Sequence, residues 1–185
     1  MGMARGFPQK GLPSGAGWAA DQFTARVNLL ARALPDYGIP AFDDDARELV
    51  VQQLCHGHAS YKEIKDVPVL PALRDLLSPA QLALLDRLAP ERVTLSNGRS
   101  LRVQYADSPD PYVSARIQEL FGVTSLPALA GGRIPLAIHI LAPSQRPVQI
   151  TRDLPGFWRD HYPRVRSELS RKYPKHPWPP GPLAP

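Results

Sequence analysis

The longest apolar run in the chain, Ile134–Leu141, has the pattern of a β-strand. Large aliphatic residues occupy every second position, and most positions between them are also apolar, which predicts a central strand buried on one face and mostly buried on the other. Turn residues follow in Ala142–Gln145, and Val148 and Ile150 then share one face of Pro147–Thr151. We therefore predict a hairpin.

The segment after this hairpin has helical spacing. Asp153 stands where an N-cap is expected, and a helix that covers the sheet is predicted from the apolar residues Leu154, Trp158, Tyr162, Val165 and Leu169. Pro163 lacks a backbone donor, so we expect a kink there or a new helix with Pro163 in its first turn. Trp158 is predicted to lie in the core, and Trp178, between prolines, is predicted to anchor an extended tail.

A second hairpin is predicted upstream. Alternating apolar residues flank Asn97–Gly98, which is a strong signal for a type I′ turn. Val113–Phe121 is interpreted as a short helix that ends at Gly122. The predicted fold class is thus α+β, with an antiparallel sheet of about four strands in two hairpins, covered by helices.

The N-terminal half has helical periodicity. Helices are predicted over Asp21–Leu34, after Asp43–Asp45 and after Ser78–Pro79, with short helical turns in Tyr61–Val67 and Val69–Leu77. The domain prediction is a disordered leader at 1–18, a helical layer at 19–90, an α+β domain at 91–179 and a flexible tail at 180–185.

The composition limits the cellular compartments in which the protein is expected. The single cysteine, Cys55, excludes an internal disulfide framework and fits a reducing compartment. No apolar run approaches the ~18 residues of a membrane span, and the N-terminus lacks the apolar core of a signal peptide. We expect a cytoplasmic protein without a membrane partner.

Catalytic and metal-binding motifs are missing from the sequence. Gly6–Gly11 has glycine spacing similar to a phosphate-binding loop but lacks the Lys and Ser/Thr that such a loop requires. Asp43–Asp45 is interpreted as a helix cap rather than as a metal site, because consecutive carboxylates on a helix point around its axis instead of converging. Cys55–His58 is interpreted as a helix end, because no second Cys/His pair has suitable spacing for zinc. His139 is interpreted as a hydrogen-bonded core histidine. We expect no catalytic residue, metal or cofactor in this chain.

Positive charge gathers in the second half. Residues 1–90 hold nine Lys+Arg and ten Asp+Glu, whereas residues 91–185 hold thirteen and seven. The candidate nucleic-acid-binding residues are Arg146, Arg152, Arg159, Arg164, Arg166, Arg171, Lys172 and Lys175. For any one of them, a solvated helix face remains an alternative, with the aliphatic stem packed on the apolar layer.

Three long stretches carry a family resemblance: PYVSARIQELFGV, GGRIPLAIHILAPSQRPVQITRDLPGFW and HYPRVRSELSRKYPKHPWP. They resemble the C-terminal region of the HrpB-type DEAH-box ATP-dependent RNA helicases, with looser similarity back to about Asp21. In that family ATP hydrolysis depends on motifs of the two helicase domains, and this chain has none of them. The resemblance implies an accessory domain whose partner is the helicase motor, in cis or in trans, and which contacts RNA or another protein.

Two hypotheses about function follow. The first is a non-catalytic accessory domain that docks on a helicase motor and contacts RNA through its basic face. The second is a protein-interaction module that binds no nucleic acid and whose arginines pair with an acidic protein surface.

Overall fold

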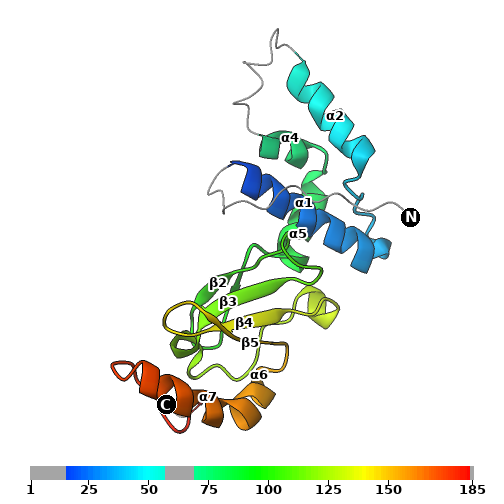
Figure 1. The fold of residues 1–185 in the computed structure, drawn as a ribbon. Coiled ribbons are helices and arrows are strands. Elements are labelled where there is room, and N and C mark those ends of the chain that lie inside the picture. The colour runs from blue at the N-terminus through cyan, green and yellow to red at the C-terminus, as the bar shows by residue number, and fades with distance from the viewer. Residues whose placement is uncertain (1–15, 57–68, 184–185) are drawn as a thin grey trace, which may run out of the picture.

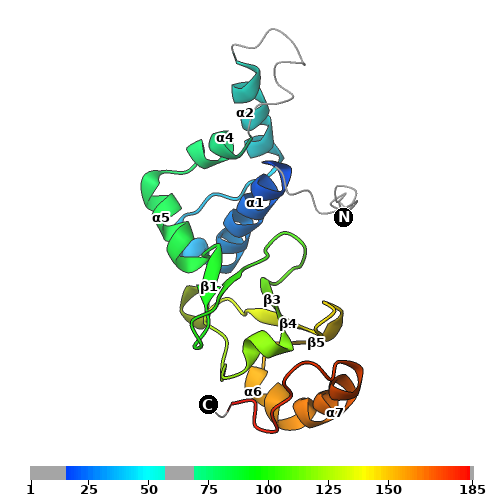
Figure 2. The ribbon, with the colours of Figure 1, turned by 90° about the vertical axis from the view of Figure 1, so that its left-hand side faces the viewer.

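The structure is a computed structural model that describes residues 16–56 and 69–183. A group of helices lies at one end of the molecule, the strands lie in the middle, and the C-terminal helices lie at the other end (Figure 1). The view turned by a quarter shows the same order of layers (Figure 2). The α+β class predicted from the sequence is confirmed.

The helical layer consists of α1 (Ala16–Ala33), α2 (Asp44–Cys55), α4 (Val69–Asp75) and α5 (Pro79–Leu88), with a 3₁₀ turn η1 at Pro35–Tyr37. The predicted caps are confirmed. Asp43 accepts a hydrogen bond from the backbone N–H of Ala46, and Ser78 forms a reciprocal capping box with Gln81. These side chains satisfy backbone donors that a helix start leaves without partners.

Arg26 of α1 joins this layer to the rest of the chain. It is 1% exposed, and its Nε donates to the carbonyl of Ala89 at 2.8 Å. Its terminal nitrogens pair with Asp86 at 2.7 Å and Glu91 at 3.2 Å. The guanidinium therefore links α1 to the end of α5 and to the first residues of the strand region.

The strands form two sheets among the described residues. The first is the antiparallel hairpin of β1 (Arg92–Thr94) and β2 (Ser100–Arg102). The second has the order β3-β4-β5, where β4 (Ala137–Leu141) pairs antiparallel with β5 (Pro147–Thr151). Both predicted hairpins are confirmed. The prediction of a purely antiparallel sheet of about four strands is wrong, because a fifth strand, β3, runs parallel to β4.

That fifth strand, β3 (Tyr112–Arg116), replaces the first part of the predicted helix Val113–Phe121. Val113 and Ala115 alternate with exposed residues and are buried, so the segment has the period of a strand. The small Ala115 hid this alternation in the sequence. Only its continuation is helical, as the 3₁₀ turn η2 at Ile117–Leu120.

The turn of the first hairpin also differs from the prediction. Gly98 has φ 81°, whereas Asn97 is not among the residues with positive φ, so the two-residue type I′ turn does not form. The N–H of Gly98 bonds to the carbonyl of Leu95, and the N–H of Leu95 bonds to that of Arg99. This is a three-residue loop in which glycine alone takes the left-handed conformation.

The C-terminal helix has three parts. α6 (Leu154–Gly156) is capped by Asp153, as predicted, and continues as the π-helical turn η4 (Phe157–His161) and then as α7 (Tyr162–Lys172). Pro163 lies in the first turn of α7, directly after the π-helical turn, and the helix runs through it without a break. The predicted position of Pro163 in a first turn is confirmed, but a separate new helix does not form there.

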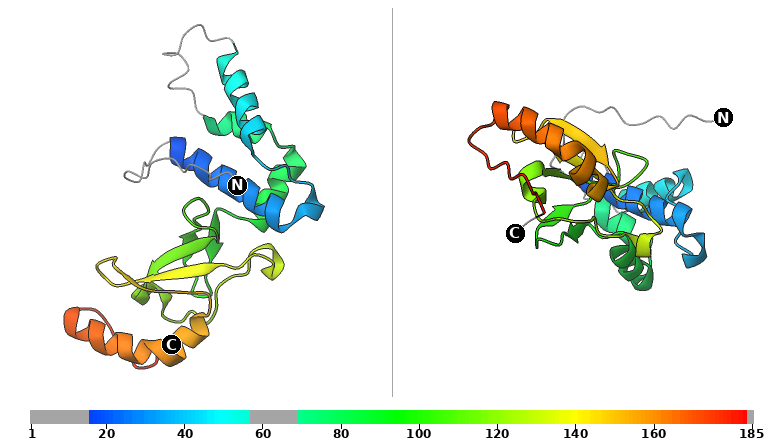
Figure 3. Two further views of the ribbon diagram at one scale, coloured as in Figure 1. Left: turned by 45° about the vertical axis from the view of Figure 1, so that its right-hand side comes forward. Right: turned by 90° about the horizontal axis from the view of Figure 1, so that it is seen from below.

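The chain after α7 folds back along the molecule. Arg166 Nε donates to the carbonyl of Trp178 at 2.8 Å, Tyr162 Oη donates to that of Pro179 at 2.7 Å, and the N–H of Gly122 donates to that of Pro182 at 2.8 Å. The predicted anchoring by Trp178 is confirmed. The segment predicted as a flexible tail is held against the domain as far as Pro182, which is buried (Figure 3).

Two other predictions concern the N-terminal half of the chain. α1 begins at Ala16, so the last three residues assigned to the leader belong to a helix. The rest of the leader, 1–15, and the helical turn predicted at Tyr61–Val67 lie outside the described residues.

Candidate nucleic-acid interface

The eight candidate residues come from two neighbouring parts of the fold. Arg146 lies in the turn between β4 and β5, and Arg152 follows β5. Arg159 lies in η4, and the others lie on α7 or in the loop after it. Strand pairing and the position of α7 against the sheet region thus bring part of the predicted set to one end of the molecule.

Four of the eight already have a partner. Arg152 pairs with Asp110, Arg159 with Asp160 at 2.8 Å and Arg164 with Glu168 at 3.2 Å, and Arg166 bonds to the carbonyl of Trp178. The hydrogen bond from Arg159 lowers the pKa of Asp160 below its ordinary value. The charges of Arg152, Arg159 and Arg164 are therefore partly neutralised before any ligand arrives.

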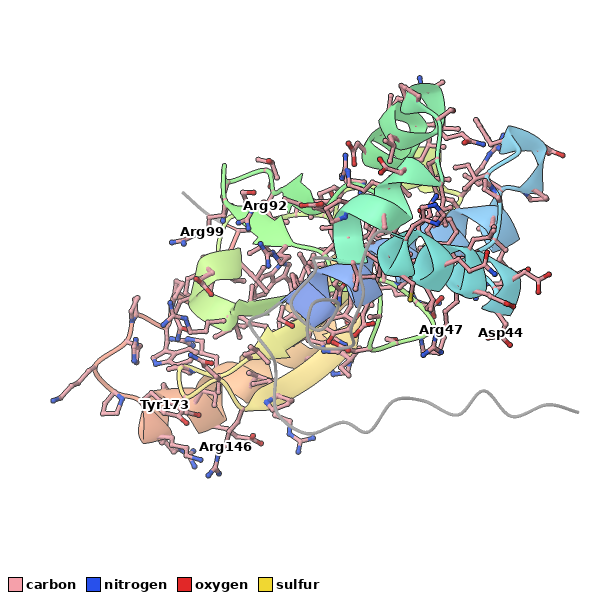
Figure 4. The ribbon with its side chains drawn as sticks, turned by 90° about the horizontal axis from the view of Figure 1, so that it is seen from above. Asp44, Arg47, Arg92, Arg99, Arg146 and Tyr173 are labelled. Carbon is pink, nitrogen blue, oxygen red and sulfur yellow. The ribbon has the colours of Figure 1, made fainter. Side chains whose placement is uncertain are left out.

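Arg146, Arg171, Lys172 and Lys175 differ from the other four. Each is exposed, and none forms an ion pair with another described residue. Tyr173 Oη donates to Ser144 Oγ at 2.7 Å and so fixes the end of α7 against the β4–β5 turn. Figure 4 shows Arg146 and Tyr173 at the same end of the molecule. We call these four cations the basic end.

The loop after α7 is held by hydrogen bonds to one carbonyl group. The carbonyl of Tyr173 accepts from Trp178 Nε1 at 2.9 Å and from the N–H of His176 at 3.2 Å. Lys172 Nζ lies 5.8 Å from the centre of the Tyr173 ring, within the range of a cation–π contact. Lys175, within this loop, is therefore kept near the end of α7.

The basic end can neutralise phosphates but has no evident means to read bases. Its Arg171 and Lys172 lie in the last turn of α7, where a cation also stabilises the helix dipole. Four aromatic side chains alternate with the basic residues in the sequence. Trp158 and Tyr162 are buried, whereas Tyr173 and Trp178 are half-buried. Trp158 is 5% exposed and Tyr162 is 1% exposed, so neither is available for stacking.

His139 lies in a different environment from the one predicted. It is half-buried rather than in the core, and its ring stacks on Tyr112 with centroids 3.9 Å apart and planes 8° apart. Burial lowers its pKa below the ordinary value. The pair was not predicted because the residues directly after Tyr112, Val113–Phe121, were interpreted as a helix. Recognition of β3 as a strand would have placed both rings on one face.

The described part of the chain was also searched for metal sites, free thiols and membrane-spanning helices. No group of three or more His, Cys, Asp or Glu residues there could hold a metal ion. Cys55 is a free, exposed thiol at the end of α2. No helix within residues 16–56 and 69–183 has the length and apolar character needed to cross a membrane.

Comparison with known proteins gives consistent matches. The family described as "ATP-dependent helicase C-terminal" (HrpB_C) matches residues 50–182. The ATP-dependent RNA helicase HrpB of Escherichia coli K12 is 37% identical over 97% of this chain, and the chain spans 23% of that protein.

Solved structures agree with this match. A crystal structure of the E. coli DExH-box NTPase HrpB superimposes with a TM-score of 0.79 and 36% identity, over 90% of this chain and 21% of that one. A crystal structure of the E. coli DEAH/RHA helicase HrpB gives a TM-score of 0.67 at 36% identity, over 87% of this chain and 21% of that one.

Proposed function

We propose, from the premise that this chain belongs to the HrpB-type family of ATP-dependent helicases as its C-terminal domain, that it is a non-catalytic accessory domain. In this proposal it docks on the helicase motor and contacts RNA through the basic end. The family membership supports the motor as partner. The observation that carries the RNA contact concerns Arg146, Arg171, Lys172 and Lys175. None of them has an ion-pair partner among the described residues, and the Tyr173–Ser144 hydrogen bond joins the two segments that hold them.

The number of cations bears on the strength of the RNA contact. Each phosphate neutralised by Lys or Arg releases condensed counterion, and four cations can neutralise about four phosphates. Such contacts position a nucleic acid without reading its sequence. An accessory domain with this surface would hold RNA beside the motor, and the motor would supply movement along it.

The lack of catalytic motifs supports a non-catalytic role. Phosphoryl transfer requires a cradle for the phosphates and an acidic residue for Mg²⁺, and the sequence contains no such loop. The proposal therefore includes no cofactor for this chain. It also places the protein in the cytoplasm, where the free thiol of Cys55 would stay reduced.

The proposal is tested with the purified chain, labelled single-stranded RNA and a separately expressed HrpB motor. We expect RNA retention at about 50 mM salt and loss at high salt, because the contact is electrostatic. The motor should be captured, and no ATP turnover should occur with or without RNA. Turnover that is lost when a residue of this chain is mutated would contradict the non-catalytic role. Absence of RNA retention with intact motor capture would favour the protein-interaction module.

A further inference from the structure

One face of the three-stranded sheet is partly open among the residues that the structure describes. Val113, Ala115, Ile138 and Ile140 point into the core and are at most 3% exposed. Tyr112, His139 and Ile150 lie on the opposite face of β3, β4 and β5. At 61% exposure, Ile150 is the most exposed large hydrophobic side chain in the described part of the chain. Ser114 and Arg116 of β3 are exposed on the same face, so its apolar part lies toward β5, at Ile150.

This face is hollowed by a groove of about 440 Å³. Its walls come from all three strands and from the loop before β3, and they include Asp107, Tyr112, His139 and Ile150. The stacked rings of Tyr112 and His139 form one wall of the groove. The volume suits one or two side chains of an extended segment.

The groove is lined by the carboxylates of Asp107 and Asp110 and by the guanidinium of Arg152, so its lining carries a net negative charge. Asp110 is paired with Arg152, but no basic side chain within the described residues pairs with Asp107. Burial and the charge of Asp107 raise the pKa of Asp21 on α1, so these two carboxylates repel each other. Burial, the charge of Asp107 and a hydrogen bond with Asp107 raise the pKa of Tyr112, which keeps that phenol protonated. A phosphate backbone would be repelled here, whereas a cation would be attracted.

The backbone of β5 offers further contacts. β5 is the last strand in the order β3-β4-β5, so one of its edges has no strand partner among the described residues. An extended segment can pair with such an edge through its own backbone while its side chains enter adjacent pockets.

We propose that this open sheet face docks an extended protein segment that places an arginine or lysine side chain against Asp107 and an apolar side chain against Ile150. The stacked rings of Tyr112 and His139 contact the aliphatic stem of the basic side chain. This interaction is separate from the basic end, so a failure of RNA binding there leaves the test below unaffected.

Titration of the ¹⁵N-labelled full chain with the peptide acetyl-Leu-Arg-Leu-amide, followed by two-dimensional NMR, tests this proposal. We expect the amide signals of Asp107, Ser108 and Thr151 to shift, and acetyl-Leu-Glu-Leu-amide to leave them in place. In Asp107→Asn the arginine peptide should bind about three- to fivefold more weakly, as for loss of a part-exposed ion pair. Asp36→Asn, at an exposed site on η1, is the matched control and should bind as the unmodified chain does.

Ile150→Thr gives an independent check, because it retains β-branching and removes apolar area. This substitution should also weaken binding of the arginine peptide. The proposal is overturned if neither peptide shifts the groove signals, if both shift them equally, or if Asp107→Asn and Asp36→Asn behave alike. It is also overturned if an oligouridylate, rather than the arginine peptide, shifts these signals, since the face would then bind RNA.

Discussion

The indole Nε1 of Trp158 donates a hydrogen bond to the carbonyl of Val123 at 2.8 Å. Trp158 is 5% exposed, and the rings of Phe157 and Tyr162 meet it edge-on at centroid distances of 5.1 Å and 5.2 Å. One side chain of η4 therefore fixes the C-terminal helices to the segment that follows η2.

Replacement of Trp158 tests its place in the core. Trp158→Ala should lower the free energy of unfolding by about 3–5 kcal/mol, because it removes a large buried ring and leaves a cavity. Ile138→Ala, in the centre of β4, should cost about 2–5 kcal/mol. Urea denaturation measures both. Leu49→Ala, at a site 52% exposed on α2, is the control and should stay within about 0.5 kcal/mol. An unchanged midpoint for Trp158→Ala would mean that the ring does not pack in the core.

The buried guanidinium of Arg26 should matter more than either of its acidic partners. Arg26→Met leaves the Ala89 carbonyl without its donor and should cost about 1–3 kcal/mol. Asp86→Asn and Glu91→Gln should each cost less than about 1 kcal/mol, because both carboxylates are mostly in solvent. Thermal denaturation of the three variants compares them. If one carboxylate proves as important as the arginine, the ion pairs rather than the buried hydrogen bond hold the layers together.

Glu119 should give the fold a pH dependence in acid. Burial alone would raise its pKa, but hydrogen bonds from Arg116 and the charges of Arg116 and Arg99 outweigh burial and lower it below 4.5. Its stabilising contribution is thus complete above about pH 4.5 and is lost as pH falls through the folded pKa.

The variant Glu119→Gln makes this dependence measurable. At neutral pH it should reduce stability by about 0.5–1 kcal/mol, since the carboxylate is partly exposed, and the difference from the unmodified chain should vanish in strong acid. Glu48→Gln, an exposed change on α2, is the control for replacing a surface glutamate. A constant difference for Glu119→Gln across pH would contradict the pKa argument.

Much of the fold could be predicted because local rules and tertiary packing agree there. Asp43, Ser78 and Asp153 cap helices as their positions predict, and the alternation in Ile134–Leu141 identifies the central strand. These features depend on neighbours in the sequence. The parallel strand β3 does not, since its partner β4 lies more than twenty residues away and its short alternation fits helix spacing equally well.

The candidate site was predicted less completely for a similar reason. Charge composition identified a basic region, but the pairing of Arg152 with Asp110 joins residues distant in sequence. The contact between Tyr173 and Ser144 also arises from the position of α7 against a turn, which no local pattern encodes. The open face with Tyr112 and His139 went unnoticed because one of its strands was assigned to a helix.

The most direct test of the RNA contact is the salt dependence of binding to single-stranded RNA, measured by fluorescence anisotropy for two double variants. With four phosphate contacts, the log-log slope of affinity against salt should be about −2.8 for the unmodified chain. Replacing Arg146 and Arg171 by Gln should reduce its magnitude by about 1.4, equally for unrelated RNA sequences. Arg159→Gln with Arg164→Gln removes the same charge from paired positions and should leave the slope nearly unchanged. Equal effects of both double variants, or no binding at about 50 mM salt, would contradict the assignment of the basic end as the RNA contact.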